Sequence, residues 1–354
     1  MTPAETRVRE AFAWQAGICA SAGAPFTGRL CGLIGARLDR STALGQRVLE
    51  WEGVPSHEGD ALPLRLAGGL HALARSGEAP ELTAVYPPKT APEDDEALWS
   101  VIGAAIATHA DFLEPWLDGP PQTNEVGRSA ALMAGLLVLA DRFGLPFRTM
   151  ELGASAGLNS RLDRFHHRLG ATEAGDPSSA VRLAPGWTGR SPPPAPVTII
   201  ERTAVDRAPL DPTEAATRER LAAYVWVDQT ERLARLEAAL NIAAAHPLIV
   251  ERADAAAWLE NSLPLEPEPG VCRVVMHTIA FQYFGAEAQD RILRHLAAVG
   301  ERATGTAPLA WLSFEAAATG AERRPELMLT VWPGGDGVKL ATAQPHGAEI
   351  EWLA

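Results

Sequence analysis

The sequence predicts an α/β protein in which an all-helical domain precedes a domain with a mostly parallel sheet and an antiparallel C-terminal edge. Up to about position 146, apolar residues recur at helical spacing. After that position, short apolar runs alternate with helix-like stretches, as in βαβ units. Near the end, two apolar runs flank a Pro-Gly-Gly-Asp-Gly turn, which indicates a hairpin. We therefore expect a helical domain at 1–146, serving as a substrate cover or cap, and an α/β domain at 147–354.

The first part of the chain contains residues that are typical of helix starts and caps. Pro92 and the acidic residues 93–96 are typical of a helix start, where acids face the positive end of the helix dipole. After the break at 120–121, Thr123 or Asn124 can cap a further helix that ends near residue 144. These features predict helices throughout the first domain.

The second part contains both element types in alternation. Strands are expected at 147–152, 197–205, 247–252, 271–276 and 309–314, and helices at 159–169, 213–244 and 286–299. The hairpin covers 327–332 and 338–343, with 350–353 extending its final strand. Residues 170–196 are rich in Gly and Pro, so we expect an irregular insertion that forms a surface loop or lid.

Composition limits the function classes. The chain carries 31 basic and 44 acidic residues, a net charge of −13, which argues against nucleic acid as a partner. No apolar run is long enough to span a bilayer. Three cysteines without CxxC spacing exclude a complete disulfide framework and a cysteine zinc site. We expect a cytoplasmic protein that acts on a small molecule, binds no metal and does not associate with a membrane.

The most informative segment is Met-Glu-Leu-Gly-Ala-Ser-Ala-Gly-Leu-Asn at 150–159, between an expected strand and an expected helix. It lacks the Gly-Lys-Ser/Thr of a P-loop and the spacing of GxGxxG. It does match GxSxG, the turn that carries the nucleophile of α/β-hydrolases. In that hypothesis Ser155 is the nucleophile, Asp254 orients the base, and the base is His277 or His346.

The other hypothesis is an S-adenosylmethionine site, and the context favours it. The preceding 150 residues look helical, whereas a hydrolase turn follows several strands. Acids also follow successive expected strands, at the edge where open α/β sheets bind ligands. Glu151 would support the methionine amino group, Asp206 the ribose and Asp254 the adenine. The cofactor-binding turn would comprise Gly153, Ser155, Gly157 and Asn159.

Other polar residues are candidates for the substrate side. His277 lies at the expected end of the fourth strand, where an imidazole can act as a base, although a buried histidine that hydrogen-bonds a loop fits equally. Asp228 is a pocket candidate that could instead pair with Arg232. The candidate pocket residues together are Asn124, Glu125, Arg128, Trp226, Asp228 and Tyr283.

Four segments carry a resemblance to a known family. They are Gln-Thr-Asn-Glu-Val-Gly-Arg at 122–128, the segment at 151–159, Tyr-Val-Trp-Val-Asp-Gln at 224–229, and His-Thr at 277–278. In these the chain resembles a bacterial family called domain of unknown function 2332, for which no reaction is established. More distantly, the C-terminal half resembles class I S-adenosylmethionine-dependent methyltransferases. That resemblance implies a Rossmann-like, seven-stranded sheet with one antiparallel strand and the cofactor at the strand tips.

The sequence thus leads to a hypothesis with two alternatives. The leading one is an S-adenosylmethionine-dependent methyltransferase that acts on a small molecule. The alternatives are a serine hydrolase that uses Ser155, and a non-catalytic protein that binds a nucleoside-like ligand.

Overall fold

The computed structural model describes residues 1–317 and 324–354. These residues divide into two compact units. The first consists of Met1–Thr123 and Ala215–Ala234, and the second of Asn124–Glu214 and Arg235–Ala354. The expected boundary at 146 thus lies instead at 123/124, and the segment 215–234 joins the first unit rather than the second.

The first unit is built of helices whose ends carry side-chain caps. The Thr2 hydroxyl accepts the N–H of Glu5 at 3.2 Å, and Asp94, within the acidic run, accepts that of Ala97 at 2.9 Å. The acidic run therefore begins a helix as expected. The helices are α1 (Pro3–Ser21), α2 (Pro25–Arg37), α3 (Ala43–Leu49), α4 (Leu62–Ser76), α5 (Pro80–Val85), α6 (Asp95–Thr108), α7 (Ala110–Asp118) and α9 (Ala215–Ala223), while α10 (Thr230–Ala245) begins in this unit and ends in the second.

A turn interrupts the single helix expected at 213–244. It lies between α9 and α10 and brings Asp228 to the start of α2. There the carboxylate accepts the N–H groups of Phe26 at 2.7 Å and Thr27 at 3.0 Å, and the Thr27 hydroxyl at 2.6 Å. Asp228 thus caps α2, which explains why the chain leaves the helical path here.

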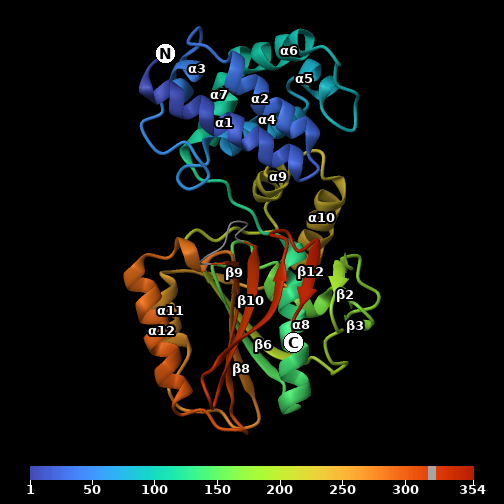
Figure 1. The fold of residues 1–354 in the computed structure, drawn as a ribbon, viewed down its shortest axis with the longest axis vertical. Helices are drawn as coiled ribbons and strands as arrows, with labels where there is room; N and C mark the ends of the chain where they lie inside the picture. Colours follow the sequence, from blue (N-terminus) through green and yellow to red (C-terminus); the bar gives the residue numbers. More distant parts are fainter. Residues whose placement is uncertain (318–323) are drawn as a thin grey trace. The chain divides into compact units, whose positions relative to one another are not determined.

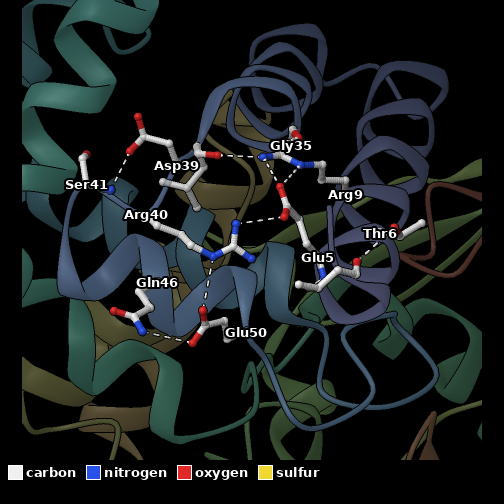
Figure 2. Close-up of polar contacts among 11 residues, drawn as sticks. Glu5, Thr6, Arg9, Gly35, Asp39, Arg40, Ser41, Gln46 and Glu50 are labelled. Atoms are coloured by element: carbon white, nitrogen blue, oxygen red, sulfur yellow. Dashed lines mark hydrogen bonds and ion pairs between the residues drawn. The ribbon is translucent and has the colours of Figure 1, made fainter.

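A buried carboxylate joins α1 to the segment after α2 (Figure 2). Glu5 is 6% exposed. Its Oε1 lies 2.8 Å from Nη2 of Arg9, and its Oε2 lies 2.9 Å from Nη1 of Arg40. Arg9 also donates to the Gly35 carbonyl, and Arg40 continues to Glu50. The hydrogen bonds from Arg9 and Arg40 lower the pKa of Glu5 to about 2, so this carboxyl stays ionised over most of the pH range.

The second unit is organised around a large sheet. Its strand order is β5-β12-β11-β10-β9-β8-β1-β6-β7 within the described residues. Strands β7, β6, β1, β8 and β9 are mutually parallel, whereas β10, β11 and β12 each run antiparallel to the strand before them. The bounds are β1 (Phe147–Leu152), β5 (Gly186–Thr188), β6 (Ile199–Asp206), β7 (Val250–Arg252), β8 (Cys272–Thr278), β9 (Leu309–Ala316), β10 (Pro325–Trp332), β11 (Gly337–Ala343) and β12 (Glu349–Trp352).

Helices cover both faces of this sheet. Figure 1 shows α11 (Ala255–Ser262) and α12 (Ala286–Gly300) together on one side, and α8 (Ser129–Phe143) on the other. On the first side, Trp258 and Ile292 share an apolar core with Leu152. On the second, Gly135 of α8 lies so close to β9 that an added Cβ would approach the Leu312 side chain to 2.5 Å. This packing assigns α8 to the sheet and not to the helical unit.

The order of the strands reverses beside β1. The chain runs from β1 outward through β6 to β7, then returns to β8 on the other side of β1 and continues to β9. The mostly parallel sheet and its antiparallel edge are therefore confirmed. The sheet exceeds the seven strands with one antiparallel member that the methyltransferase resemblance implied, because β10, β11 and β12 form a meander and β5 pairs with β12.

Three local expectations were wrong. The helix expected at 159–169 is a 3₁₀ turn, η2 (Asn159–Arg164), followed by strand β2 (His166–Leu169). The insertion at 170–196 is also more regular than expected. It contributes β3 (Thr172–Gly175) and β4 (Arg182–Leu183) to a small sheet with β2, and β5 to the large sheet. Likewise, β12 pairs beside β11 and does not extend it.

Further short elements are η1 (Val126–Arg128) and η3 (Phe281–Tyr283). Within the ranges given above, no helix has the length and apolar character needed to cross a membrane.

Candidate active site

Backbone strain marks the carboxyl ends of the two central strands. Ser155, in the turn after β1, has φ 55°, and Ile279, after β8, has φ 47°. Non-glycine residues rarely adopt such angles, and a β-branched isoleucine does so least readily. Since β1 and β8 are neighbours at the point where strand order reverses, both residues lie where open α/β sheets bind ligands. Strain at such a place supports a functional site.

The glycine-rich turn after β1 is packed against protein on two sides. Gly153 and Gly157 have φ 69° and 65°. A Cβ on Gly153 would come within 2.6 Å of the Ala280 Cβ, and one on Gly157 within 3.0 Å of Val250. Chain packing and positive φ therefore require these glycines. Because η2 follows instead of a regular helix, the turn does not present the helix N-terminus that the sequence predicted.

Asp206, at the end of β6, is bonded to this turn. One carboxylate oxygen accepts the N–H of Ser155 at 2.8 Å, and the other accepts that of Ala208 at 2.8 Å. Leu210 then donates to the Ser155 carbonyl at 3.2 Å. Asp206 therefore supports the strained residue and stays half-buried at the sheet edge.

Glu151 is a buried ionisable group in β1, the strand that leads into the turn. It is 2% exposed and accepts a hydrogen bond from the Ser160 hydroxyl. Burial raises the pKa of Glu151 to about 7, although the Ser160 hydrogen bond and the nearby charge of Arg161 act in the opposite direction. At neutral pH this carboxyl is therefore close to half protonated.

Arg161 fastens the turn to the chain before β7. Its Nη1 donates to the Gly157 carbonyl at 2.6 Å and its Nε to the His246 carbonyl at 2.8 Å. The side chain is 1% exposed, and burial lowers the pKa of its guanidinium. Neither Ser160 nor Arg161 was predicted from the sequence, because each acts through a tertiary contact.

Asp254, after β7, is the N-cap of α11. Its Oδ1 accepts the N–H groups of Ala256 at 3.1 Å and Ala257 at 3.0 Å and lies 3.9 Å from Arg291. The side chain is 42% exposed at the same edge of the sheet as Asp206.

The segment at 124–128 contacts both central loops. Asn124 accepts the N–H of Leu158 at 3.0 Å, so it holds the glycine-rich turn instead of capping a helix. Arg128 donates to the Thr278 carbonyl at 3.2 Å and to the Pro345 carbonyl at 3.0 Å. Glu125 accepts the N–H of Gly127 at 3.0 Å and lies 3.5 Å from the His346 ring.

Asn159 completes this set of contacts. Its side-chain oxygen accepts the Ser129 hydroxyl, at the start of α8, at 2.8 Å. The structure thus brings the segments 124–128, 151–159 and 277–278 together at the ends of β1 and β8. Trp226 and Asp228, two further pocket candidates, belong to the first unit, where Asp228 caps α2.

His277 is wholly buried, with both ring nitrogens occupied. Its Nδ1 lies 2.6 Å from a carboxylate oxygen of Glu315, and its Nε2 accepts the indole N–H of Trp311 at 2.9 Å. An indole nitrogen only donates, so Nε2 holds the lone pair and Nδ1 holds the proton. A base needs a free lone pair. The geometry therefore favours the other interpretation made from the sequence, a buried histidine that organises a loop.

Glu315, near the end of β9, is a further candidate-site residue that was not predicted from the sequence. The oxygen that bonds His277 also accepts the N–H groups of Ala280 at 2.9 Å and Phe281 at 3.1 Å. Burial alone would raise the pKa of Glu315, but these bonds, led by that from His277, hold it below its usual range. An acid near the end of a buried strand was the signal that could have identified Glu315.

Tyr283, the remaining pocket candidate, lies in η3 and is 71% exposed.

The structure supports the hydrolase hypothesis only in part. Ser155 is strained, but it does not form a catalytic triad with His277 and Asp254. The Ser155 hydroxyl is buried and makes no hydrogen bond within the described part of the chain. His277 and Asp254 are committed to Glu315 and to α11, and His346 lies beside Glu125. A metal is no better supported, since the described residues contain no cluster of three or more His, Cys, Asp or Glu side chains suited to one.

Comparison with known families agrees with the motifs gathered at this site. The family described as "Uncharacterized protein conserved in bacteria (DUF2332)" matches residues 9–352. The chain belongs to this family. No curated protein and no solved structure matches it. The DUF2332 match spans both compact units, so the helical unit is as much a part of the family as the sheet.

Proposed function

We propose that this DUF2332 protein is an S-adenosylmethionine-dependent methyltransferase that acts on a small molecule. The observation that carries the proposal is the set of acids at one edge of three neighbouring parallel strands. Glu151 lies in β1, Asp206 ends β6 and Asp254 follows β7. The reversal of strand order beside β1 adds support, because ligands of open α/β sheets bind outside the carboxyl ends at such a point.

The acids fit an adenosine group. Each Asp206 oxygen accepts one backbone N–H, and a carboxylate oxygen has a second lone pair with which to accept a ribose hydroxyl. The bonds that cap α11 use Oδ1 of Asp254, which leaves Oδ2 for the adenine amino group. The glycines contribute less, since Gly153 and Gly157 face protein. The proposal therefore rests on the carboxylates.

The chain's own residues would bind and orient. Asp206 and Asp254 would hold the adenosine, and Glu151 would face the amino group of the methionine part. When bound, the cofactor supplies an electrophilic methyl group, and rate enhancement comes chiefly from alignment of the acceptor. His277 has no proton-transfer step here, because it would first have to release Trp311. The excess of acidic over basic residues disfavours nucleic acid as the acceptor.

Calorimetric titration with S-adenosylmethionine and S-adenosylhomocysteine tests the proposal. We expect micromolar binding by the wild-type protein. Asp254→Asn keeps one side-chain oxygen to cap α11 but has an NH₂ group in place of the second carboxylate oxygen. The affinity of this variant for both ligands should therefore fall about tenfold or more. The matched control is Glu251→Gln, an exposed acid on β7. Absence of binding by folded wild-type protein, or equal affinity in both variants, contradicts the proposal. Labelling of Ser155 by a fluorophosphonate would then favour the hydrolase.

A further inference from the structure

The loop after β8, residues 279–284, is fixed from two sides. On one side, Glu315 of β9 accepts the N–H groups of Ala280 and Phe281 with a single oxygen. On the other, the side-chain amide of Gln289 in α12 donates to the carbonyls of Phe281 at 2.8 Å and Phe284 at 3.0 Å. The backbone of Ile279 also donates to the Phe314 carbonyl at 2.7 Å. These bonds tie the loop to both β9 and α12.

The loop needs this support because it contains strain. Ile279 adopts φ 47°, which costs free energy for a β-branched residue and persists only where surrounding contacts determine it. The ring of Phe281 stacks on that of His277, with centroids 5.1 Å apart and planes within 19°. The loop therefore packs against the buried histidine.

The same loop forms one wall of the glycine-rich turn. The Ala280 methyl group occupies the space that a side chain on Gly153 would need. A movement of Ala280 would therefore change the surroundings of Gly153, next to Ser155 and the acids proposed to bind adenosine. Tyr283, at the exposed end of the loop, would move with it.

We infer that Glu315 is a positioning residue that, with His277 as its partner, fixes the loop 279–284 against the glycine-rich turn and so sets the affinity of the ligand site. His277 contributes by fixing the carboxylate. Trp311 occupies Nε2, so the only ring proton lies on Nδ1 and is donated to Glu315. The part of the inference that concerns affinity rests on the proposed function.

Hydrogen exchange and nitrogen-15 NMR test the positioning role without a ligand. Glu315→Gln preserves size but removes the charge, and we expect amide exchange in 279–284 to accelerate about tenfold or more. Glu326→Gln is the matched control, because Glu326 pairs with Lys339 near the surface of the adjacent strand β10. In wild-type protein the His277 spectrum should show a protonated Nδ1 and an unprotonated Nε2. Trp311→Phe, which keeps Glu315, should shift the Nε2 resonance.

Each result decides one part of the inference. Unchanged exchange in Glu315→Gln, or a proton on Nε2 of wild-type His277, overturns the positioning role. S-adenosylhomocysteine binding then tests the link to the site, with an affinity about tenfold lower expected for Glu315→Gln. If wild-type protein binds and the variant binds equally well despite a loosened loop, the link is overturned. If wild-type protein does not bind, the proposed function fails, and exchange still decides the positioning role.

Discussion

The carboxylate of Asp206 accepts the backbone N–H of Ser155 at 2.8 Å. This bond joins the end of β6 to the strained residue of the neighbouring turn. The φ of 55° costs free energy for a serine, and the hydrogen bond that the Ser155 N–H donates to the Asp206 carboxylate offsets part of this cost. The acid proposed to bind ribose is therefore also a structural support for the turn.

Removal of Asp206 should affect stability as well as binding. Asp206→Ala leaves the N–H groups of Ser155 and Ala208 without their acceptor, and we expect unfolding free energy to fall by about 1–3 kcal/mol. Urea denaturation measures this. Asp211→Ala serves as control, because Asp211 makes a similar local turn with Thr213 in an exposed place. Equal small losses in both variants would contradict a special role for Asp206.

The contact between Gly153 and Ala280 predicts a difference between two glycine substitutions. Gly153→Ala introduces both an unfavourable φ and a clash with Ala280, whereas Gly144→Ala, at φ 60°, meets no atom within 4 Å. The second should cost about 1–2 kcal/mol from conformation alone. The first should cost clearly more. Similar thermal denaturation midpoints for the two variants would show that the turn and the loop are not in tight contact.

Glu151 should make stability depend on pH. Its pKa is about 7 in the folded protein and 4.5 in the unfolded chain, so the folded state binds more protons between these values. Stability should therefore fall as pH rises from about 4.5 through 7, by on the order of 3 kcal/mol. Glu151→Gln should remove this decline in urea midpoints measured from pH 5 to 8.5. The exposed Glu349→Gln should retain it, and a decline that persists in Glu151→Gln would contradict the assignment.

Glu5 should act in the opposite direction, at lower pH. Its folded pKa of about 2 lies below the unfolded value of 4.5, so its ion pairs stabilise the protein fully above 4.5 and are lost as pH falls through about 2. The difference in urea midpoint between wild type and Glu5→Gln should narrow as pH is lowered from 5 to 3. The exposed Glu10→Gln should show no such trend. A constant difference would argue that packing, and not ionisation, is what Glu5 provides.

The sequence predicted the strands of the large sheet other than β5, because buried strands can be recognised from their own residues. All of β8 is buried, with an apolar stretch at 274–276 between Arg273 and His277, while β10 alternates between buried and half-buried positions. Both patterns are visible in the residues themselves. The positions of Glu151, Asp206 and Asp254 at the strand ends followed directly.

The remaining errors come from contacts between distant residues. The helix expected from Asn159 fails because Asn159 and Ser160 bond to Ser129 and Glu151, and Arg161 has non-helical angles. Similarly, the sequence located His277 at a strand end but did not show that Glu315, 38 residues later, occupies its Nδ1. Periodicity reports the face of an element and not its tertiary partner.

Crystallography of the protein with S-adenosylhomocysteine is the sharpest test of the proposed cofactor site. We expect ligand density at the carboxyl ends of β1, β6 and β7, with the ribose hydroxyls on Asp206 and the adenine amino group on Asp254. Density elsewhere, or an empty strand edge at saturating ligand, would contradict it.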